Sequence, residues 1–278
     1  MPYSFQPNAM YRMPTHFGPR TGPRRGPDGR GFDCVNSPKS MSYSVSYLTH
    51  AAAAEALLPP GFALNGEPVV TISATYMKEI DWLAGRGYNT LGASLPVCYT
   101  GQVDNVTGSL LLVLWENLTD PILTGREELG FSKIYCELPE PVVYNNSSQC
   151  IGSWLGYRFL DLRIHDMTEQ SEQEVAAQSA KGGGDGTLHY KYIPRTGEWG
   201  TADAEYAVLT PAHTPNRRVQ GMWRGKGEVE WHCARWEDMP TQYNIVNCLA
   251  GLEILEYRGA VVTKTIGGKD LSDQRILK

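Results

Sequence analysis

Lys133 is the residue of this sequence whose type and surroundings offer the most specific chemistry. Residues 124–135 read TGREELGFSKIY, so this lysine follows a charged turn of Arg126, Glu127 and Glu128 and enters an apolar segment. A neutral lysine amine attacks carbonyl carbons and forms an imine, which withdraws electrons from the neighbouring carbon. Because an exposed lysine, with a pKa near about 10.4, is almost entirely protonated at neutral pH, such chemistry requires burial or a neighbouring cation.

The pattern of this segment leaves two positions open for the lysine. If 132–138 is a strand, alternate residues point to opposite faces, and Lys133 lies opposite an apolar face of Ile134, Cys136 and Leu138. Pattern alone favours an ordinary surface lysine on the polar face. A buried, reactive amine is the alternative.

The elements that must position this segment are mostly strands. The segment 41–48 alternates polar and apolar residues, and runs rich in β-branched residues at 68–77, 108–117 and 153–167 are separated by turn residues. Strands do not alternate with long amphipathic helices, which argues against a doubly wound fold. We therefore predict a mainly β (α+β) fold with an antiparallel, closed, barrel- or cone-like sheet and few helices.

The chain divides into an arm and one domain. Residues 1–40 are rich in Pro, Gly and Arg, which disfavours helices and central strands. They predict an arm that is disordered or wraps the surface, or one that packs on a neighbouring subunit or rims the active site. Residues 41–278 are expected to form a single β domain. Within it, a short helix capped by Thr49 and a polar insertion loop at 168–186 are predicted.

The charge and apolar runs exclude some partners. The net charge of −5 argues against a dedicated nucleic-acid binder, which carries a basic face. No apolar run approaches the roughly 20 residues of a membrane span, and the N-terminus lacks a secretory apolar stretch. We expect a cytoplasmic protein that binds neither nucleic acid nor membrane.

Metal and cofactor motifs are missing from the sequence. The six cysteines include no CxxC pair, and the histidines form no HExxH motif or cluster, so neither a metal nor a cofactor is predicted. KGGGDG at 181–186 resembles a phosphate-binding loop, but such a loop needs a helix after it. A strand-like segment follows instead, so we predict a flexible loop.

GREELGFSK resembles the Gly-Arg-Glu…Pro-Lys signature of acetoacetate decarboxylase and its superfamily. The likeness extends to the approach LLLVLWENLTDPILTGREELGF and to LHYKYIPRTGEW, and it can be followed from about 41 to 262. The resemblance implies a β-rich, barrel- or cone-like fold and a homo-oligomer. It also implies that Lys133 is the Schiff-base lysine in a buried cavity, with an oxo acid as substrate.

The segment also departs from the classical decarboxylases. Ile134 stands where they carry a second lysine, and Ser132 replaces the proline before the catalytic lysine. The positions of the family's two cavity acids fall near Thr90 and Thr71, and that of its N-terminal arginine falls near 39–40. These acids and the arginine therefore look absent, which favours the divergent, biosynthetic branch that resembles pyruvate aldolase-dehydratases.

Four further residues are candidates for substrate binding or proton transfer: Arg126, Glu128, Tyr88 and Tyr243. Each has a structural alternative, such as an ion pair between Arg126 and Glu127 or a core position for Tyr243. We predict a Schiff-base-forming lyase that acts on a small or medium oxo acid, by decarboxylation or by aldol condensation and dehydration. A non-imine cyclisation or isomerisation and a non-catalytic binding module stay open as alternatives.

Overall fold

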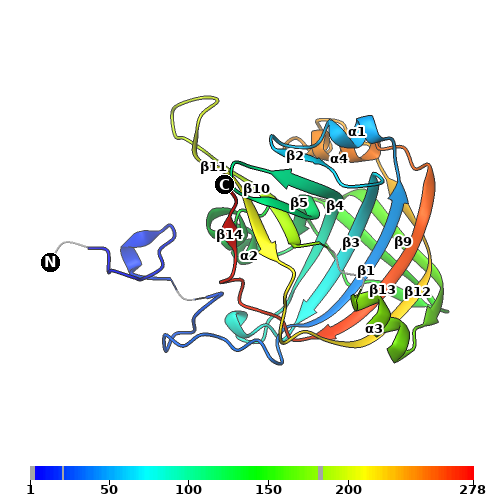
Figure 1. Ribbon diagram of the computed structural model, residues 1–278, viewed down its shortest axis with the longest axis horizontal. Helices are drawn as coiled ribbons and strands as arrows, with labels where there is room; N and C mark the ends of the chain where they lie inside the picture. Colours follow the sequence, from blue (N-terminus) through cyan, green and yellow to red (C-terminus); the bar gives the residue numbers. More distant parts are fainter. Residues whose placement is uncertain (1–3, 21, 181–183) are drawn as a thin grey trace.

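The protein was analysed as a computed structural model that describes residues 4–20, 22–180 and 184–278. A strongly curved sheet forms its body, and the N-terminal arm extends along one side of it (Figure 1). The described strands are β1 (Lys39–Leu48), β2 (Phe62–Leu64), β3 (Val69–Lys78), β4 (Tyr88–Thr100), β5 (Asn105–Glu116), β6 (Lys133–Tyr135), β7 (Val142–Tyr144), β8 (Ser147–Trp154), β9 (Tyr157–Glu169), β10 (Gly186–Pro194), β11 (Ala202–Pro211), β12 (Arg218–Trp231), β13 (Glu256–Ile266) and β14 (Arg275–Ile276).

Helices are few and short, as predicted. The described α-helices are α1 (Ala51–Glu55), α2 (Thr119–Thr124), α3 (Glu172–Ala180) and α4 (Tyr243–Ala250). Two 3₁₀ turns, η1 (Thr15–Phe17) and η2 (Asp81–Leu83), and a π-helical turn, η3 (Gly125–Leu129), complete the set. None of the helices in the described part of the chain is long and apolar enough to cross a membrane.

The strand order corrects one part of the predicted fold. The order β14-β11-β10-β5-β4-β3-β1-β13-β12-β9-β8-β7 is an open path, with β2 added on β4 and β6 on β5. Most neighbours are antiparallel, but β5 pairs in parallel with both β10 and β6. The mainly β character is confirmed, whereas the closed, antiparallel barrel or cone is not. Long connections let β6 and β10 join β5 in parallel, which a hairpin does not allow.

The two faces of the sheet carry different residues because side chains alternate along each strand. On β1, Tyr43, Val45 and Tyr47 are buried in the apolar core. The serines between them point to the other face and meet hydroxyls of β3, as in the 2.9 Å pair of Ser42 and Thr75. We call this second side the polar face.

Two local predictions differ from the structure. The first residue before α1 is His50, and the Thr49 hydroxyl is buried without a hydrogen bond to the described residues, so Thr49 does not cap that helix. Residues 168–186 are not all loop, because β9 runs to Glu169 and α3 follows. Ser171 and Glu174 bond each other's backbone N–H groups in a capping box, the signal that starts α3.

The KGGGDG segment lies only partly within the described residues, since 181–183 are outside them. The backbone N–H of Asp185 donates to Thr107 O at 2.7 Å, and its backbone carbonyl accepts from Ala212 N at 2.8 Å. Strand β10 begins at the next residue, Gly186. The described end of the segment therefore leads into a strand, which does not provide the helix N-terminus of a phosphate-binding loop.

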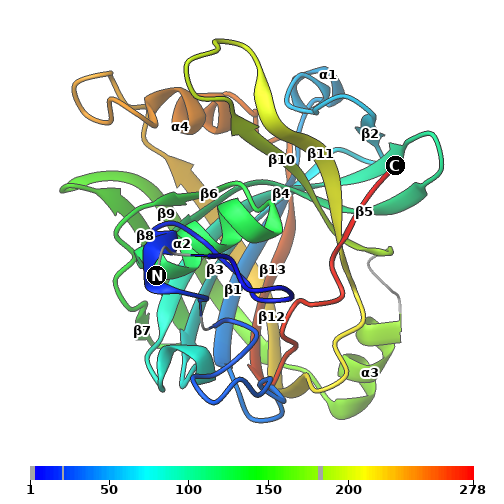
Figure 2. The ribbon, with the colours of Figure 1, turned by 90° about the vertical axis from the view of Figure 1, so that its left-hand side faces the viewer.

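The N-terminal arm packs against the segment α2–η3. Figure 2 shows the arm crossing in front of α2. Arg12 is buried there, and its guanidinium donates to the Thr124 hydroxyl and lies 3.5 Å from Glu128 Oε1. Arg24 lies 3.5 Å from the other oxygen of the same carboxylate. Ionic contacts of Arg12 and Arg24 with Glu128 thus hold the arm against the segment α2–η3.

Gln242 ties the start of α4 to the core strands. Its Oε1 accepts a 2.7 Å hydrogen bond from Trp115 Nε1, and its Nε2 donates to Tyr135 O at 2.9 Å. Trp115 is fully buried and stacks at an angle on Phe159. Removing the amide would leave one buried and one partly buried polar group without this partner.

We predict that Gln242→Ala lowers the free energy of unfolding by about 2–3 kcal/mol, because Trp115 Nε1 and Tyr135 O lose their partner. Chemical denaturation provides the measurement. Gln102→Ala, at an exposed position, is the matched control and should change stability by less than about 0.5 kcal/mol. Equal effects of the two substitutions would contradict the role given to Gln242.

Candidate active site

Strand β6 turns the Lys133 side chain onto the polar face. In the parallel pairing of β5 and β6, Leu114 lies opposite Lys133 and Trp115 opposite Ile134. Ile134 packs against the core, and Cys136 after the strand is fully buried, so the predicted alternation is present. The Lys133 side chain is only 7% exposed, and the surface-lysine alternative is therefore wrong.

The segment α2–η3 covers the Lys133 side chain and buries it. Lys133 Nζ donates a 3.1 Å hydrogen bond to Pro121 O in α2. The side chain passes directly under Gly125, where a Cβ would lie 2.3 Å from Lys133 Cδ and 2.8 Å from Nζ. The glycine of the GRE segment therefore leaves the space that the amine occupies.

Glu116 is the charged partner of the amine. Its Oε1 lies 2.9 Å from Lys133 Nζ, and its side chain is completely buried. The contact is an ion pair without hydrogen-bond geometry, and neither carboxylate oxygen accepts a hydrogen bond from the described residues. Burial raises the pKa of Glu116, and the positive charge of Lys133 acts against this rise.

One cross-strand row of polar residues leads to this pair. Thr263, Ser42, Thr75, Thr90 and Glu116 are direct neighbours in register across β13, β1, β3, β4 and β5. Directly opposed residues share a face of the sheet. The site therefore belongs to the polar face, and Glu116 supplies an acid beside the position near Thr90, where the sequence analysis had found none.

Two aromatic rings flank the amine. Lys133 Nζ lies 5.0 Å from the ring centroid of Phe131 and 6.0 Å from that of Tyr88. Burial, aided by the charge of Glu116, raises the pKa of the Tyr88 phenol. Tyr88 therefore stays a hydrogen-bond donor, and its hydroxyl has no recorded bond within the described residues.

His189 forms the buried wall behind Phe131. Its ring is fully buried, lies 4.0 Å from the Phe131 ring and bonds Thr210 Oγ1 through Nε2 at 2.9 Å. Burial, with the charge of Lys133, lowers the pKa of His189 to about 3. The imidazole is therefore neutral, and its Nδ1 has no partner among the described residues.

A cavity of about 500 Å³ opens on the other side of Tyr88 and Phe131. We call it the lysine cavity. Hydroxyl side chains of the sheet, such as Ser42, Thr75 and Thr210, line it, and residues of the N-terminal arm and of the C-terminal segment 267–271 cover it. The amine thus lies one layer of side chains away from a cavity of substrate size that has both hydroxyl and apolar side chains in its lining.

The other predicted site residues divide into three places. Arg126 lies over β6 and donates from Nη1 to Lys133 O at 2.8 Å. Within the described residues it forms no ion pair with Glu127. Glu128 faces the arm, where Arg12 and Arg24 hold it. Burial raises the pKa of Glu128, and these arginines oppose the rise. Tyr243 lies on α4 and makes no contact with Lys133 that involves a hydrogen bond or ring within the described residues. Its side chain is 37% exposed, which excludes a core position.

Glu116 and His189 were missed by the sequence analysis. Glu116 ends an apolar strand, where a charge usually marks solvent, and 16 residues lie between it and Lys133. Only the parallel pairing of β5 with β6 brings the two together. A signal existed in the apolar run before Glu116, since it predicts that the strand is buried on both faces.

One group of metal-ligating side chains lies elsewhere. The ligand atoms of Asp161, Glu230 and His232 on and after β9 and β12 lie within 4.8 Å of one another. Asp161 already accepts hydrogen bonds from Gln149, His232 and Arg158. Its lone pairs are thus used by protein donors, and an arginine beside it disfavours a cation.

We predict that Gly125→Ala displaces the Lys133 side chain, because the new Cβ would overlap its Cδ and Cε. A crystal structure of the variant should show the amine out of ion-pair contact with Glu116. The free energy of unfolding should fall by about 3 kcal/mol, because a buried charge loses its partner. Gly31→Ala, whose Cβ would meet nothing closer than 3.7 Å, is the control. An unmoved amine in Gly125→Ala would contradict the packing described.

We predict that Glu116 titrates above the usual range of glutamate and that Lys133→Ala raises its pKa further, since the opposing positive charge is lost. Carbon-13 NMR of glutamate carboxyls is the measurement, with Glu116→Gln assigning the signal. In Lys133→Ala the folded state keeps a proton that the unfolded state releases. Its stability should therefore fall as pH rises from the usual pKa of glutamate through the raised one. A normal Glu116 titration in this variant would refute the assigned burial.

Comparisons with known proteins agree with this architecture. The family model "Acetoacetate decarboxylase (ADC)" matches residues 12–263. A search of curated proteins gives no match. The crystal structure of acetoacetate decarboxylase from Legionella pneumophila subsp. pneumophila str. Philadelphia 1 has a TM-score of 0.65 at 18% identity, over 91% of this chain and 92% of that chain.

Two further solved structures belong to other enzymes. An acetoacetate decarboxylase-like enzyme from Sphingomonas wittichii RW1 has a TM-score of 0.61 at 18% identity, over 87% of this chain and 92% of that chain. The enduracididine biosynthesis enzyme MppR, complexed with the condensation product of pyruvate and imidazole 4-carboxaldehyde, has a TM-score of 0.59 at 17% identity, over 98% of this chain and 99% of that chain. At such identities the likeness shows a shared fold. With the family model spanning most of the sequence, the chain belongs to the acetoacetate decarboxylase family.

Proposed function

We propose that the protein is a lyase that forms a Schiff base between Lys133 and an oxo acid. The observation that carries this proposal is the buried contact of 2.9 Å between Lys133 Nζ and Glu116 Oε1, beside a cavity lined in part by hydroxyl side chains. A buried lysine, such as Lys133 at the start of β6, is costly to keep unless it is paired or used. Membership of the acetoacetate decarboxylase family supports the use of this amine as a nucleophile.

The ion pair gives the amine a local proton acceptor. Imine formation needs the neutral amine, and burial raises the pKa of Glu116, which makes its carboxylate a better base. Transfer of one proton from Lys133 to Glu116 converts two buried charges into two neutral groups. No second cation needs to lie beside the amine, which accounts for the tolerance of Ile134 next to Lys133.

The same carboxyl group is placed for the next step. After the amine attacks the carbonyl carbon, the proton held by Glu116 passes to the departing hydroxyl, which leaves as water and restores the carboxylate. The protonated imine then draws electrons from the adjacent carbon. That carbon lies two bonds from the lysine nitrogen, within reach of a carboxylate that contacts the nitrogen. Glu116 is therefore the candidate base for the enamine. Tyr88, a protonated phenol facing the cavity, is the candidate donor to a substrate oxygen.

A 2-oxo acid such as pyruvate is the substrate class that this arrangement favours. Forming an enamine from pyruvate requires a base, and Glu116 meets that requirement. MppR, a structural neighbour, has been solved with pyruvate at a TM-score of 0.56 and with a pyruvate condensation product. An aldol condensation with loss of water follows when the enamine attacks an aldehyde in the lysine cavity.

Decarboxylation of a β-keto acid is the second candidate. It uses the same imine as the electron sink, and the family model that matches the chain is that of acetoacetate decarboxylase. Loss of CO₂ gives the enamine without a base, so Glu116 would then serve only amine activation and reprotonation. The two reactions thus differ in what they ask of Glu116.

We predict that pyruvate and cyanoborohydride label Lys133 covalently, as read by peptide mass spectrometry, because the imine is reduced in place. Lys133→Ala should carry no adduct. Glu116→Gln should slow labelling by roughly 10²-fold, the usual contribution of a positioned base. Lys264→Ala, an exposed lysine on β13, is the control and should label as the wild type does.

Two results would oppose the proposal. One is an adduct spread over exposed lysines with none on Lys133. The other is full turnover of an identified substrate by Lys133→Ala, which would establish a non-imine reaction. Acetoacetate run in parallel separates the two candidates, since only a decarboxylase releases CO₂ from it through Lys133.

A further inference from the structure

A second pocket lies behind the strand that carries the lysine. It has a volume of about 270 Å³, and we call it the Arg126 pocket. Ser132 and Ile134, the neighbours of Lys133 on either side, line it, whereas the Lys133 amine points to the opposite face. Phe131 lines both this pocket and the lysine cavity. The two spaces are therefore separate and share one aromatic side chain.

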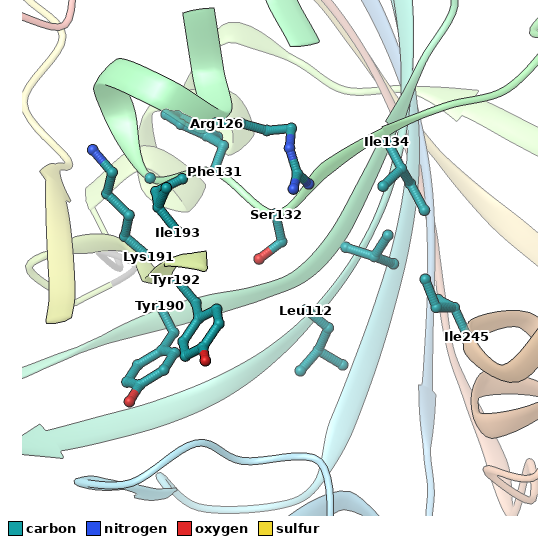
Figure 3. A pocket seen from close by; sticks show the side chains of 12 residues that line it. Leu112, Arg126, Phe131, Ser132, Ile134, Tyr190, Lys191, Tyr192, Ile193 and Ile245 are labelled. Carbon is teal, nitrogen blue, oxygen red and sulfur yellow. The ribbon is translucent and has the colours of Figure 1, made fainter. Parts of the chain in front are cut away.

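Arg126 brings an unused positive charge to this pocket. A guanidinium has five N–H donors, and in the described residues only Nη1 has a recorded hydrogen bond, to Lys133 O at 2.8 Å. No carboxylate among the described residues forms an ion pair with Arg126, and no acidic side chain lines the pocket. Lys191 points away from it, as Figure 3 shows, and donates to Glu127 O at 2.7 Å.

The remaining lining has a polar and an apolar side. In Figure 3 the Arg126 side chain lies next to Ser132, whose hydroxyl points into the space above Leu112. The Ser132 hydroxyl has no recorded hydrogen bond within the described residues. Leu112 and Ile134, with Ile245 on α4, form the apolar wall. An anion held at Arg126 and Ser132 would thus place a compact apolar body against these side chains.

We propose that the Arg126 pocket is a second small-molecule site that binds an organic carboxylate with a compact apolar or aromatic body. The planar guanidinium matches a carboxylate with two parallel hydrogen bonds, and Ser132 offers a third donor. The pocket lies near the lower end of the size range of ligand sites, about 300–1,000 Å³, which suits a small acid.

A ligand in the Arg126 pocket would contact groups that hold β6, the strand that begins with Lys133. Arg126 holds the carbonyl of Lys133, and Ser132 precedes it, so a carboxylate drawn to both groups acts on the backbone that carries the amine. The pocket is therefore placed to act as an effector site or as the seat of a second reactant. Its occupation does not require imine formation, which separates this inference from the proposed function.

Benzoate is the probe, titrated into isoleucine-methyl-labelled Lys133→Ala protein and followed by NMR. This variant removes any imine chemistry from the readout. We expect the methyl signals of Ile134, Ile193 and Ile245, which line the pocket, to shift together. Ile80 lines the lysine cavity instead and should not shift. Benzamide, of the same shape without the charge, should bind at least about tenfold more weakly, the loss expected for a charged hydrogen-bonded pair.

Two variants locate the site. Arg126→Gln should remove the preference for benzoate over benzamide, and Ile245→Trp should fill the pocket and weaken both by at least about tenfold. Arg30→Gln, with an arginine side chain that is 88% exposed, is the charge control and should change nothing. No benzoate binding up to about 10 mM, shifts at Ile80 alone, or affinities untouched by Arg126→Gln and Ile245→Trp would each overturn the proposal.

Discussion

The contact between Lys133 and Glu116 is the constraint on which the rest of the site depends. Two opposite charges placed out of water are costly, and their attraction offsets that cost only when the surroundings hold them together. Neither oxygen of Glu116 accepts a hydrogen bond from the described residues, so the carboxylate is poorly satisfied apart from the amine. A buried pair of this kind contributes little to stability. A single proton transfer from the amine to the carboxylate would neutralise both groups.

Several elements cover this pair. The segment α2–η3 lies across the polar face, and its Gly125 leaves room for the lysine stem. Lys191 from β10 bonds the carbonyl of Glu127, and Arg12 of the N-terminal arm reaches Thr124 and Glu128. A π-helical turn such as η3 is unfavourable in itself and occurs often at functional sites. Its contacts on both sides hold it over the amine.

Sequence reasoning found the lysine more readily than its partner. The alternation of Ile134 and Cys136 placed one face of β6 in the core, and the GREELGFSK resemblance supplied the burial of Lys133. Glu116, by contrast, depends on a parallel pairing between strands that are joined through a helix. No local period encodes that pairing. The same parallel additions to β5 make the sheet mixed, and its strand order is an open path, whereas the alternating segments had suggested a closed, antiparallel sheet. Tyr243 fell on an exposed helix face because its helix packs through Gln242 and Val246 instead.

The amino-acid sequence by itself determined the family, the β-rich composition of the fold and the lysine that we propose as the imine-forming residue. These follow from short-range patterns, since strand alternation and the spacing around a reactive residue are properties of neighbouring positions. Only the tertiary structure decided which acid meets the amine, which aromatic rings flank it, and that Arg126 faces a separate pocket behind the strand. Those facts depend on register between strands distant in the chain, and register is set by the packing of the whole sheet.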